Sequence, residues 1–154
     1  MRPDWDNYFI EIAKVVSSRA TCLRRKYGAV IVKDRVIIST GYNGSPRGME
    51  NCIDIGTCAR EELKIPSGER YELCEAVHAE QNAICQAAKR GISIKGATIY
   101  TRMTPCRTCA MLLINCGIQR VVCERKYQLA EESEQLFVEA SIQLVYKYGM
   151  QQEY

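Results

Sequence analysis

The chain has 154 residues, of which 47% are hydrophobic and 25% charged, and its formal net charge is +3. These values are typical of one soluble globular domain and exclude a disordered or collagen-like chain, and the charge is too small to indicate a nucleic-acid partner. Because no apolar run could cross a bilayer and no signal peptide is recognisable, we expect a cytoplasmic protein with no membrane partner.

The first part of the sequence predicts a helix followed by a β-hairpin. Asp4 or Asp6 is a suitable cap for a helix to about Arg19, because apolar residues recur there at three- and four-residue steps. The β-branched runs at 28–32 and 36–40 lie on either side of a polar turn, which indicates the two strands of a hairpin.

Residues 41–73 show no clear periodicity, which is unusual for so long a segment inside a compact domain. Such a segment is either a functional loop or is held together from within. Three cysteines lie in it or at its end, which favours the second interpretation. We therefore expect a single domain over residues 1–154 with a stapled insert at about 45–75, called the insert below.

Helices and strands alternate through the rest of the chain. The patterns predict helices at 75–89, 106–115 and 131–140 and strands at 97–101, 120–123 and 142–146. This alternation after an opening hairpin predicts a three-layer α/β/α domain with a mixed five-stranded sheet.

Nine cysteines and a single histidine, His78, are the most informative part of the composition. In a reducing compartment, so many cysteines indicate metal ligation or catalysis rather than disulfides. If the protein binds a metal through imidazole, His78 must be the ligand.

Two short motifs supply ligands for one metal ion. An H-A-E motif contains His78 and Glu80, and a P-C-x-x-C motif contains Cys106 and Cys109, each at the start of a predicted helix. The C-x-x-C spacing places two thiols within one turn, and the helix N-terminus favours their ionised form. Three protein ligands with one open position are typical of catalytic zinc, and Glu80 is placed to carry protons beside the ion. The plain alternative is a buried histidine with two core cysteines.

H-x-E followed by P-C-x-x-C is a signature of zinc-dependent nucleobase deaminases. Residues 41–48, G-Y-N-G-S-P-R-G, resemble the G-Y-N-G-x-P-x-G loop of deoxycytidylate deaminases, as do Cys22 with Arg24 and the run at 28–32. The resemblance includes the late-competence members of that family and extends from about residue 10 to residue 146. It implies the hydrolysis of dCMP to dUMP and ammonia, on the route to thymidylate, with one catalytic zinc.

The resemblance also implies how the nucleotide is bound. Asn43 is expected to hydrogen-bond the deoxyribose and close the base pocket. Arg24 and Tyr127 match positions expected to bind the phosphate, which arginine grips with two parallel hydrogen bonds. Rival basic residues for that role are Arg25, Lys26 and Arg47.

In many members of the family the loop that corresponds to Gly41, Tyr42 and Gly44 also senses dCTP and dTTP, so we expect these effectors here. The two glycines permit unusual backbone dihedrals and a close approach of the backbone to a neighbour. An ordinary Asn-Gly turn is the plain alternative. Because relatives commonly form hexamers, we also expect a homo-oligomer, with a hexamer as the specific expectation.

Four cysteines are expected to bind a second, structural zinc. Cys22 and Cys52 resemble structural zinc ligands of phage deoxycytidylate deaminases, in which two histidines of the insert complete the site. This chain has no second histidine, so we expect Cys58 and Cys74 to complete an all-cysteine site that staples the insert. Scattered buried cysteines are the alternative. The other cysteines, expected to pack as small apolar residues, are Cys85, Cys116 and Cys123.

Two other functions stay open. One is a different nucleobase deaminase, such as a tRNA adenosine deaminase, although a net charge of +3 gives little support to so large an anionic partner. The other is a cysteine-rich module in which zinc only holds a binding surface together. Glu80 discriminates between the classes, because a purely structural metal site would not need it beside an open coordination position.

Overall fold

The computed structural model describes residues 1–149. The elements in chain order are α1 (Trp5–Ser17), β1 (Gly28–Lys33), β2 (Val36–Tyr42), α2 (Cys52–Ile55), α3 (Ala59–Glu62), the 3-10 helix η1 (Tyr71–Leu73), α4 (Ala79–Lys89), β3 (Thr98–Met103), α5 (Arg107–Asn115), β4 (Arg120–Arg125), α6 (Glu131–Glu139) and β5 (Gln143–Tyr146). Within residues 1–149, no helix combines the length and the apolar character that crossing a bilayer requires.

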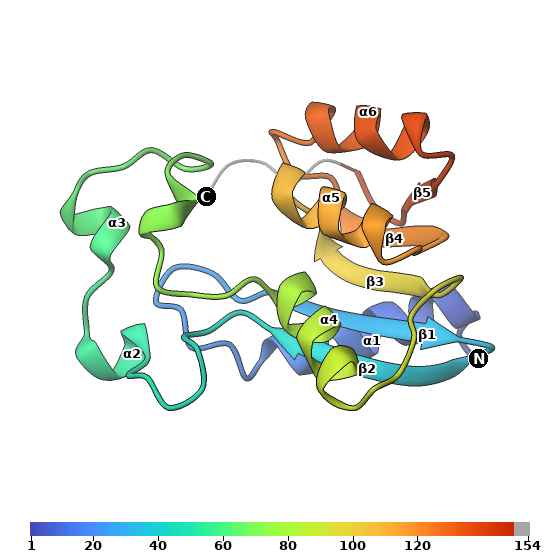
Figure 1. Cartoon of the computed structure of the whole chain (residues 1–154), viewed down its shortest axis with the longest axis horizontal. Coiled ribbons are helices and arrows are strands. Elements are labelled where there is room, and N and C mark those ends of the chain that lie inside the picture. Colours follow the sequence, from blue (N-terminus) through green and yellow to red (C-terminus); the bar gives the residue numbers. More distant parts are fainter. Residues whose placement is uncertain (150–154) are drawn as a thin grey trace.

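The sheet is mixed and has the strand order β2-β1-β3-β4-β5. β1 pairs antiparallel with both β2 and β3, whereas β3, β4 and β5 run parallel. The hairpin therefore forms one side of the sheet, and the strands separated by helices form the other (Figure 1). The predicted three-layer α/β/α domain with a mixed five-stranded sheet is confirmed.

Helices cover both faces of the sheet, and each face has its own apolar cluster. Phe9 and Ile10 of α1 pack with Val30 and Tyr100 on one face. On the other face, α4, α5 and α6 contribute a larger cluster that includes Phe137, which is fully buried. Because β1 and β3 supply residues to both clusters, the centre of the sheet is enclosed, which fits their runs of β-branched residues.

α4 approaches β2 closely because small residues form the contact. Ala79, Ala83 and Ala87 are buried along one side of α4. A Cβ atom at Gly41 would lie only 2.2 Å from the carbonyl oxygen of Ala79, so no larger residue fits there without movement. The close approach that glycine permits is present at this position. Neither Gly41 nor Gly44 has a positive φ, so neither uses the left-handed conformations that glycine also permits.

Two helices begin later than predicted. α4 begins at Ala79 rather than at residue 75, and α5 begins at Arg107 rather than at residue 106. In both cases the residue before the helix, His78 or Cys106, takes the extended N-cap conformation. The side chains that carry the two motifs therefore stand directly in front of helix N-termini.

The insert is not a plain loop. It contains the two four-residue helices α2 and α3 and the single turn η1 (Figure 1). Helices this short cover about one turn, so they leave no recognisable periodicity in the sequence.

The three cysteines expected to pack as small apolar residues differ in burial. The expectation is wrong for Cys85, because this residue on α4 is exposed, whereas Cys116 is half-buried and Cys123 is buried.

Gly41→Ala should destabilise the protein by about 1–3 kcal/mol, because the added methyl group forces α4 away from β2. Chemical denaturation monitored by circular dichroism measures the change. Gly149→Ala is the matched control, since no atom lies within 4 Å of a Cβ built there. Equal stability of the two variants would contradict the close contact between β2 and α4.

Candidate active site

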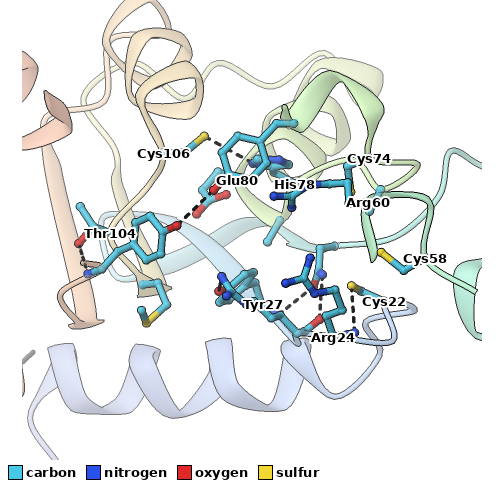
Figure 2. Close-up of a pocket in the computed structure, with 17 residues that line it drawn as sticks. Cys22, Arg24, Tyr27, Cys58, Arg60, Cys74, His78, Glu80, Thr104 and Cys106 are labelled. Atoms are coloured by element: carbon cyan, nitrogen blue, oxygen red, sulfur yellow. Dashed lines mark hydrogen bonds between the residues drawn. The ribbon is translucent and has the colours of Figure 1, made fainter. Parts of the chain in front are cut away.

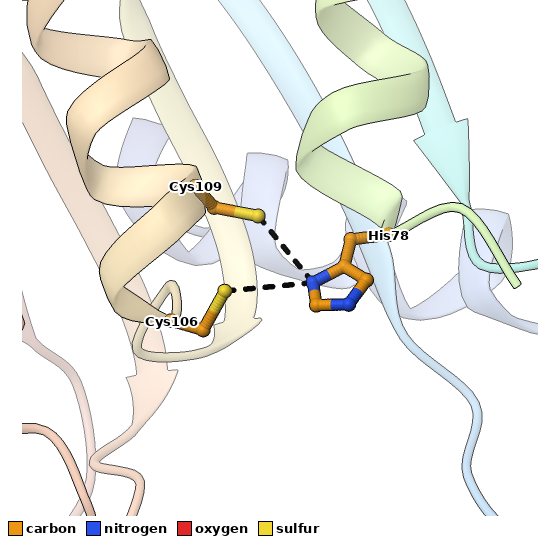
Figure 3. A group of neighbouring side chains, drawn as sticks. All are labelled: His78, Cys106 and Cys109. Carbon is orange, nitrogen blue, oxygen red and sulfur yellow. Dashed lines mark hydrogen bonds between the residues drawn. The ribbon is translucent and has the colours of Figure 1, made fainter. Parts of the chain in front are cut away.

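Three residues of the H-A-E and P-C-x-x-C motifs meet where two helices begin. His78 is the N-cap of α4, Cys106 is the N-cap of α5, and Cys109 lies in the first turn of α5. The backbone N–H of His78 donates a hydrogen bond of 3.0 Å to the Gln81 side chain, which fixes the start of α4. Figure 3 shows the imidazole facing the two thiols across the space between the helices.

The chain enters α4 from a short β-bridge that leads directly to His78. The backbone of Gly44 and the backbone of Val77 exchange two hydrogen bonds of 3.2 Å and 2.8 Å. The Asn82 side chain also donates a hydrogen bond of 2.8 Å to the carbonyl of Tyr42. The loop after β2 therefore positions the residue that precedes the histidine.

The geometry of the three side chains fits one metal ion. The Nδ1 atom of His78 lies 3.6 Å from the Cys106 sulfur and 3.4 Å from the Cys109 sulfur. The three ligand atoms all lie within 4.8 Å of one another, and no other group of three potential ligands in residues 1–149 is so close. Two thiols and one imidazole suit zinc, and this set leaves a fourth position for another ligand.

The two thiols differ in acidity. The hydrogen bond from the Cys109 thiol, helped by His78 and opposed by burial, lowers the pKa of Cys106 to about 4. Interaction with the Cys106 thiolate and burial raise the pKa of Cys109 above its usual range. Cys106 is thus the more readily ionised of the two thiols, and a dication binding here would displace the thiol protons that remain.

Glu80 lies in the first turn of α4, two residues after the imidazole. Although part of the side chain touches solvent, burial of its carboxyl group raises the pKa of Glu80 above its ordinary value. Interactions with His78 and Cys109 lower the pKa of the same carboxyl, but the effect of burial is larger. A carboxyl group with a raised pKa beside a metal site is suited to accept a proton and to return it.

A pocket extends from these residues to the insert and to the turn before β1 (Figure 2). The predicted site residues that line it are Cys22, Arg24, Asn43, Cys58, Cys74, His78, Glu80, Cys106 and Tyr127. The predicted site residues that do not line it are Gly41, Tyr42, Gly44, Cys52 and Cys109. The predicted nucleotide-binding residues therefore share one cavity with His78, Glu80 and Cys106, and the predicted effector residues lie outside it.

The predicted nucleotide-binding residues have partners within the protein. The Asn43 side chain accepts a hydrogen bond of 2.8 Å from the Tyr27 N–H and donates one of 3.0 Å to the Arg25 carbonyl. Asn43 therefore shapes the turn before β1, and its amide group still has one hydrogen and one lone pair for a ligand. Arg24 forms a 3.1 Å ion pair with Glu61.

Two aromatic residues form one wall of the pocket. The hydroxyl of Tyr127 lies 3.4 Å from the hydroxyl of Tyr71, and the Tyr71 ring meets the His78 ring edge-on at 5.3 Å between centroids. Arg60 lies over the same Tyr71 ring, 4.9 Å from its centroid. Sequence reasoning missed Tyr71 and Arg60. In the sequence Arg60 stands before Glu61 and Glu62, a pattern typical of a solvated turn.

Cys52 interacts electrostatically with the other three cysteines predicted to bind a structural zinc. Burial raises the pKa of Cys52, and electrostatic interactions with Cys22, Cys58 and Cys74 raise it further. The segments that carry Cys22 and Cys52 are joined by a hydrogen bond of 3.2 Å from the Ile53 N–H to the Thr21 carbonyl. No three of the four sulfurs lie within 4.8 Å of one another in the part of the chain that the structure describes.

A Cys-Cys-His set beside a carboxyl group, at two helix N-termini on a mixed α/β/α sheet, is the arrangement of the zinc-dependent nucleobase deaminases. Residues 3–125 match the family described as the cytidine and deoxycytidylate deaminase zinc-binding region. The chain belongs to this family.

Similar proteins carry the deoxycytidylate deaminase name. The Saccharomyces cerevisiae enzyme is 37% identical over 142 residues, which are 92% of this chain and 44% of the yeast protein. This chain thus spans less than half the length of that relative. The enzyme of Mycobacterium phage D29 is 43% identical over 126 residues, or 79% of this chain and 94% of the phage protein.

Among solved structures, the dCMP deaminase of cyanophage S-TIM5, determined in complex with dCMP and dUMP, matches with a TM-score of 0.75. It is 25% identical, and the match covers 95% of this chain and 98% of the phage chain. The two proteins therefore share their fold over almost their whole length.

Cys109→Ser should lower the zinc content of the purified protein by about one ion per chain, because a serine hydroxyl is a much poorer ligand than a thiolate. Inductively coupled plasma mass spectrometry measures the metal. Cys85→Ser is the matched control, because Cys85 is exposed and outside the cluster. Unchanged zinc in the Cys109 variant would argue against this ligand set.

Proposed function

We propose that this protein is a zinc-dependent deaminase that hydrolyses dCMP to dUMP and ammonia. The observation that carries the proposal is the convergence of the His78, Cys106 and Cys109 ligand atoms beside the Glu80 carboxyl, at a pocket whose lining also contains three arginines. Membership of the deaminase family and similarity to enzymes named deoxycytidylate deaminase support it.

His78, Cys106 and Cys109 would hold the zinc ion, and the ion would supply an activated water as the nucleophile. Glu80 accepts a proton from the attacking water and donates it to the ring nitrogen next to the carbon that bears the amine. The same carboxyl then carries a second proton to the amine, which leaves as ammonia. One carboxyl group performs both transfers because it is regenerated between them.

The rest of the pocket binds the nucleotide. We assign Asn43 to the deoxyribose, through the hydrogen-bonding capacity that its contacts with the turn before β1 leave over. We assign Arg24 and Tyr127 to the phosphate, since both line the same pocket as Glu80. The product dUMP would feed the synthesis of thymidylate.

Ammonia release from dCMP, dCTP, deoxycytidine and a tRNA anticodon stem tests the proposal. We expect dCMP to be the preferred substrate. Glu80→Gln should keep its zinc and its fold and lose turnover on the order of a hundredfold or more, because the amide cannot relay protons. Full turnover by this variant would contradict the proton-transfer role, and a preference for the tRNA stem would move the protein to the tRNA deaminases.

A structural zinc bound by Cys22, Cys52, Cys58 and Cys74 is the second part of the proposal. The electrostatic influence of the other three thiols on the pKa of Cys52 supports it, and so does the place of Cys22, Cys58 and Cys74 in the lining of one pocket (Figure 2). Metal binding would draw the sulfurs together and would staple the insert to the domain. It would therefore contribute directly to the stability of the fold.

Two zinc ions per chain are the expected metal content. Cys58→Ser should remove about one of them and lower the thermal unfolding temperature, because a structural zinc site stabilises the segment it closes. Cys85→Ser again serves as the control, with both ions retained. A single ion in the unmodified protein would exclude the four-cysteine site.

Three family properties stay predictions. They are assembly into a hexamer, regulation by dCTP and dTTP through the loop of Gly41, Tyr42 and Gly44, and a cytoplasmic location.

A further inference from the structure

Arg60 has an unusual environment for a basic residue. It is 8% exposed, and it is the one buried lysine or arginine within residues 1–149. Its Nη2 donates a hydrogen bond of 3.0 Å to the Pro66 carbonyl, whereas its Nε is buried and makes no hydrogen bond. Among the ion pairs of residues 1–149, none joins Arg60 to a carboxylate. A buried guanidinium of this kind lacks the anion that normally compensates its charge.

The position of Arg60 is defined by its neighbours. Its guanidinium lies 4.9 Å from the centroid of the Tyr71 ring, and the Tyr71 ring meets the His78 ring edge-on. Arg60, His78 and Glu80 line the same pocket (Figure 2). Tyr71 therefore lies between the buried Arg60 guanidinium and the His78 ring. Because Arg60 and Glu80 line one pocket, a single ligand can place an anionic group at Arg60 and a base at Glu80.

The other two arginines of the pocket already have partners. The charge of Arg24 is offset by Glu61, at 3.1 Å. Arg25 donates hydrogen bonds to the Ser67 hydroxyl at 2.8 Å and to the Tyr27 hydroxyl at 3.4 Å. Both side chains can assist an anion, but Arg60 is the one of the three that is buried and whose Nε makes no hydrogen bond.

We propose that Arg60 binds the phosphate group of the substrate and makes the pocket selective for a nucleoside monophosphate over the corresponding nucleoside. This inference rests on the proposed deaminase function and adds a residue to it. Its Nε–H has no partner in the protein, and the guanidinium keeps further N–H donors besides the one used for the Pro66 carbonyl, so Arg60 can donate charge-assisted hydrogen bonds to a phosphate. The contact to Tyr71 holds the planar group in place before the ligand arrives.

A structural role is the competing explanation. A site with four thiolates around one zinc ion carries a net negative charge, and Cys58 and Cys74 line the pocket together with Arg60. Arg60 could compensate that charge. In this case its loss would change zinc content or stability and would affect all substrates equally.

Arg60→Gln, Arg60→Lys and Arg70→Gln form the test set. Arg70→Gln is the matched control, because it removes the same charge from the same insert at an exposed residue that pairs with Glu72. Turnover of dCMP and of deoxycytidine, zinc content, and the calorimetric affinity for dUMP and deoxyuridine are measured for each variant and for the unmodified protein.

Arg60→Gln should reduce kcat/KM for dCMP and the affinity for dUMP about tenfold to a hundredfold, with deoxycytidine turnover and deoxyuridine affinity changed less than about threefold. Arg60→Lys should recover part of the loss, because it keeps the charge but not the guanidinium donors. Arg70→Gln should match the unmodified protein. Equal losses for nucleotide and nucleoside, or loss of zinc without a change in selectivity, would overturn the proposal.

The same measurements separate this inference from the proposed function. If the unmodified protein binds dUMP through Arg60 but deaminates neither dCMP nor deoxycytidine, the phosphate site stands and the deaminase proposal fails. If it deaminates dCMP and Arg60→Gln keeps the full preference for dCMP, the deaminase proposal stands and the role of Arg60 is wrong.

Discussion

Two helix N-termini that point at one place are the constraint on which the site depends. His78 and Cys106 each cap a helix, so their side chains meet only when α4 and α5 hold a fixed position relative to each other. A shift of one helix by a single turn, about 5.4 Å, would exceed the present 3.6 Å between Nδ1 and sulfur. The close contact of α4 with Gly41 in β2 supplies part of that fixation. The metal geometry is therefore set by the packed core.

The sequence was sufficient for those parts of the fold that follow a regular pattern. The run at 28–32 is buried throughout, as its β-branched residues indicated, and every predicted strand of the sheet is present. The motif residues could be grouped in advance, because a C-x-x-C pair and a lone histidine allow few other arrangements. The two helix starts were harder to place, since a capping residue is extended although it directly precedes a helical pattern.

The insert and its contribution to the pocket could not be predicted, for physical reasons. Its helices are single turns, and Lys64 and Arg70 adopt positive φ values that the sequence does not announce. Arg60 is buried by tertiary contacts with Tyr71 and Pro66, although its neighbours in sequence are exposed glutamates. The exposure of Cys85 likewise depends on which side of α4 meets the sheet. The sequence does not determine that side, because the alanines of this helix lie on overlapping faces.

The pocket combines parts that are separate in the chain. The groups placed for proton transfer and metal binding come from helix ends anchored on the sheet, whereas Arg60 and Tyr71 come from the insert, and Tyr71 contacts both His78 and Tyr127. Substitutions in the insert can therefore alter which molecules enter without disturbing the core that aligns the reactive groups. Such a division makes the ligand range of the fold evolvable, because selectivity and reactivity are encoded in different stretches of sequence and can diverge one at a time.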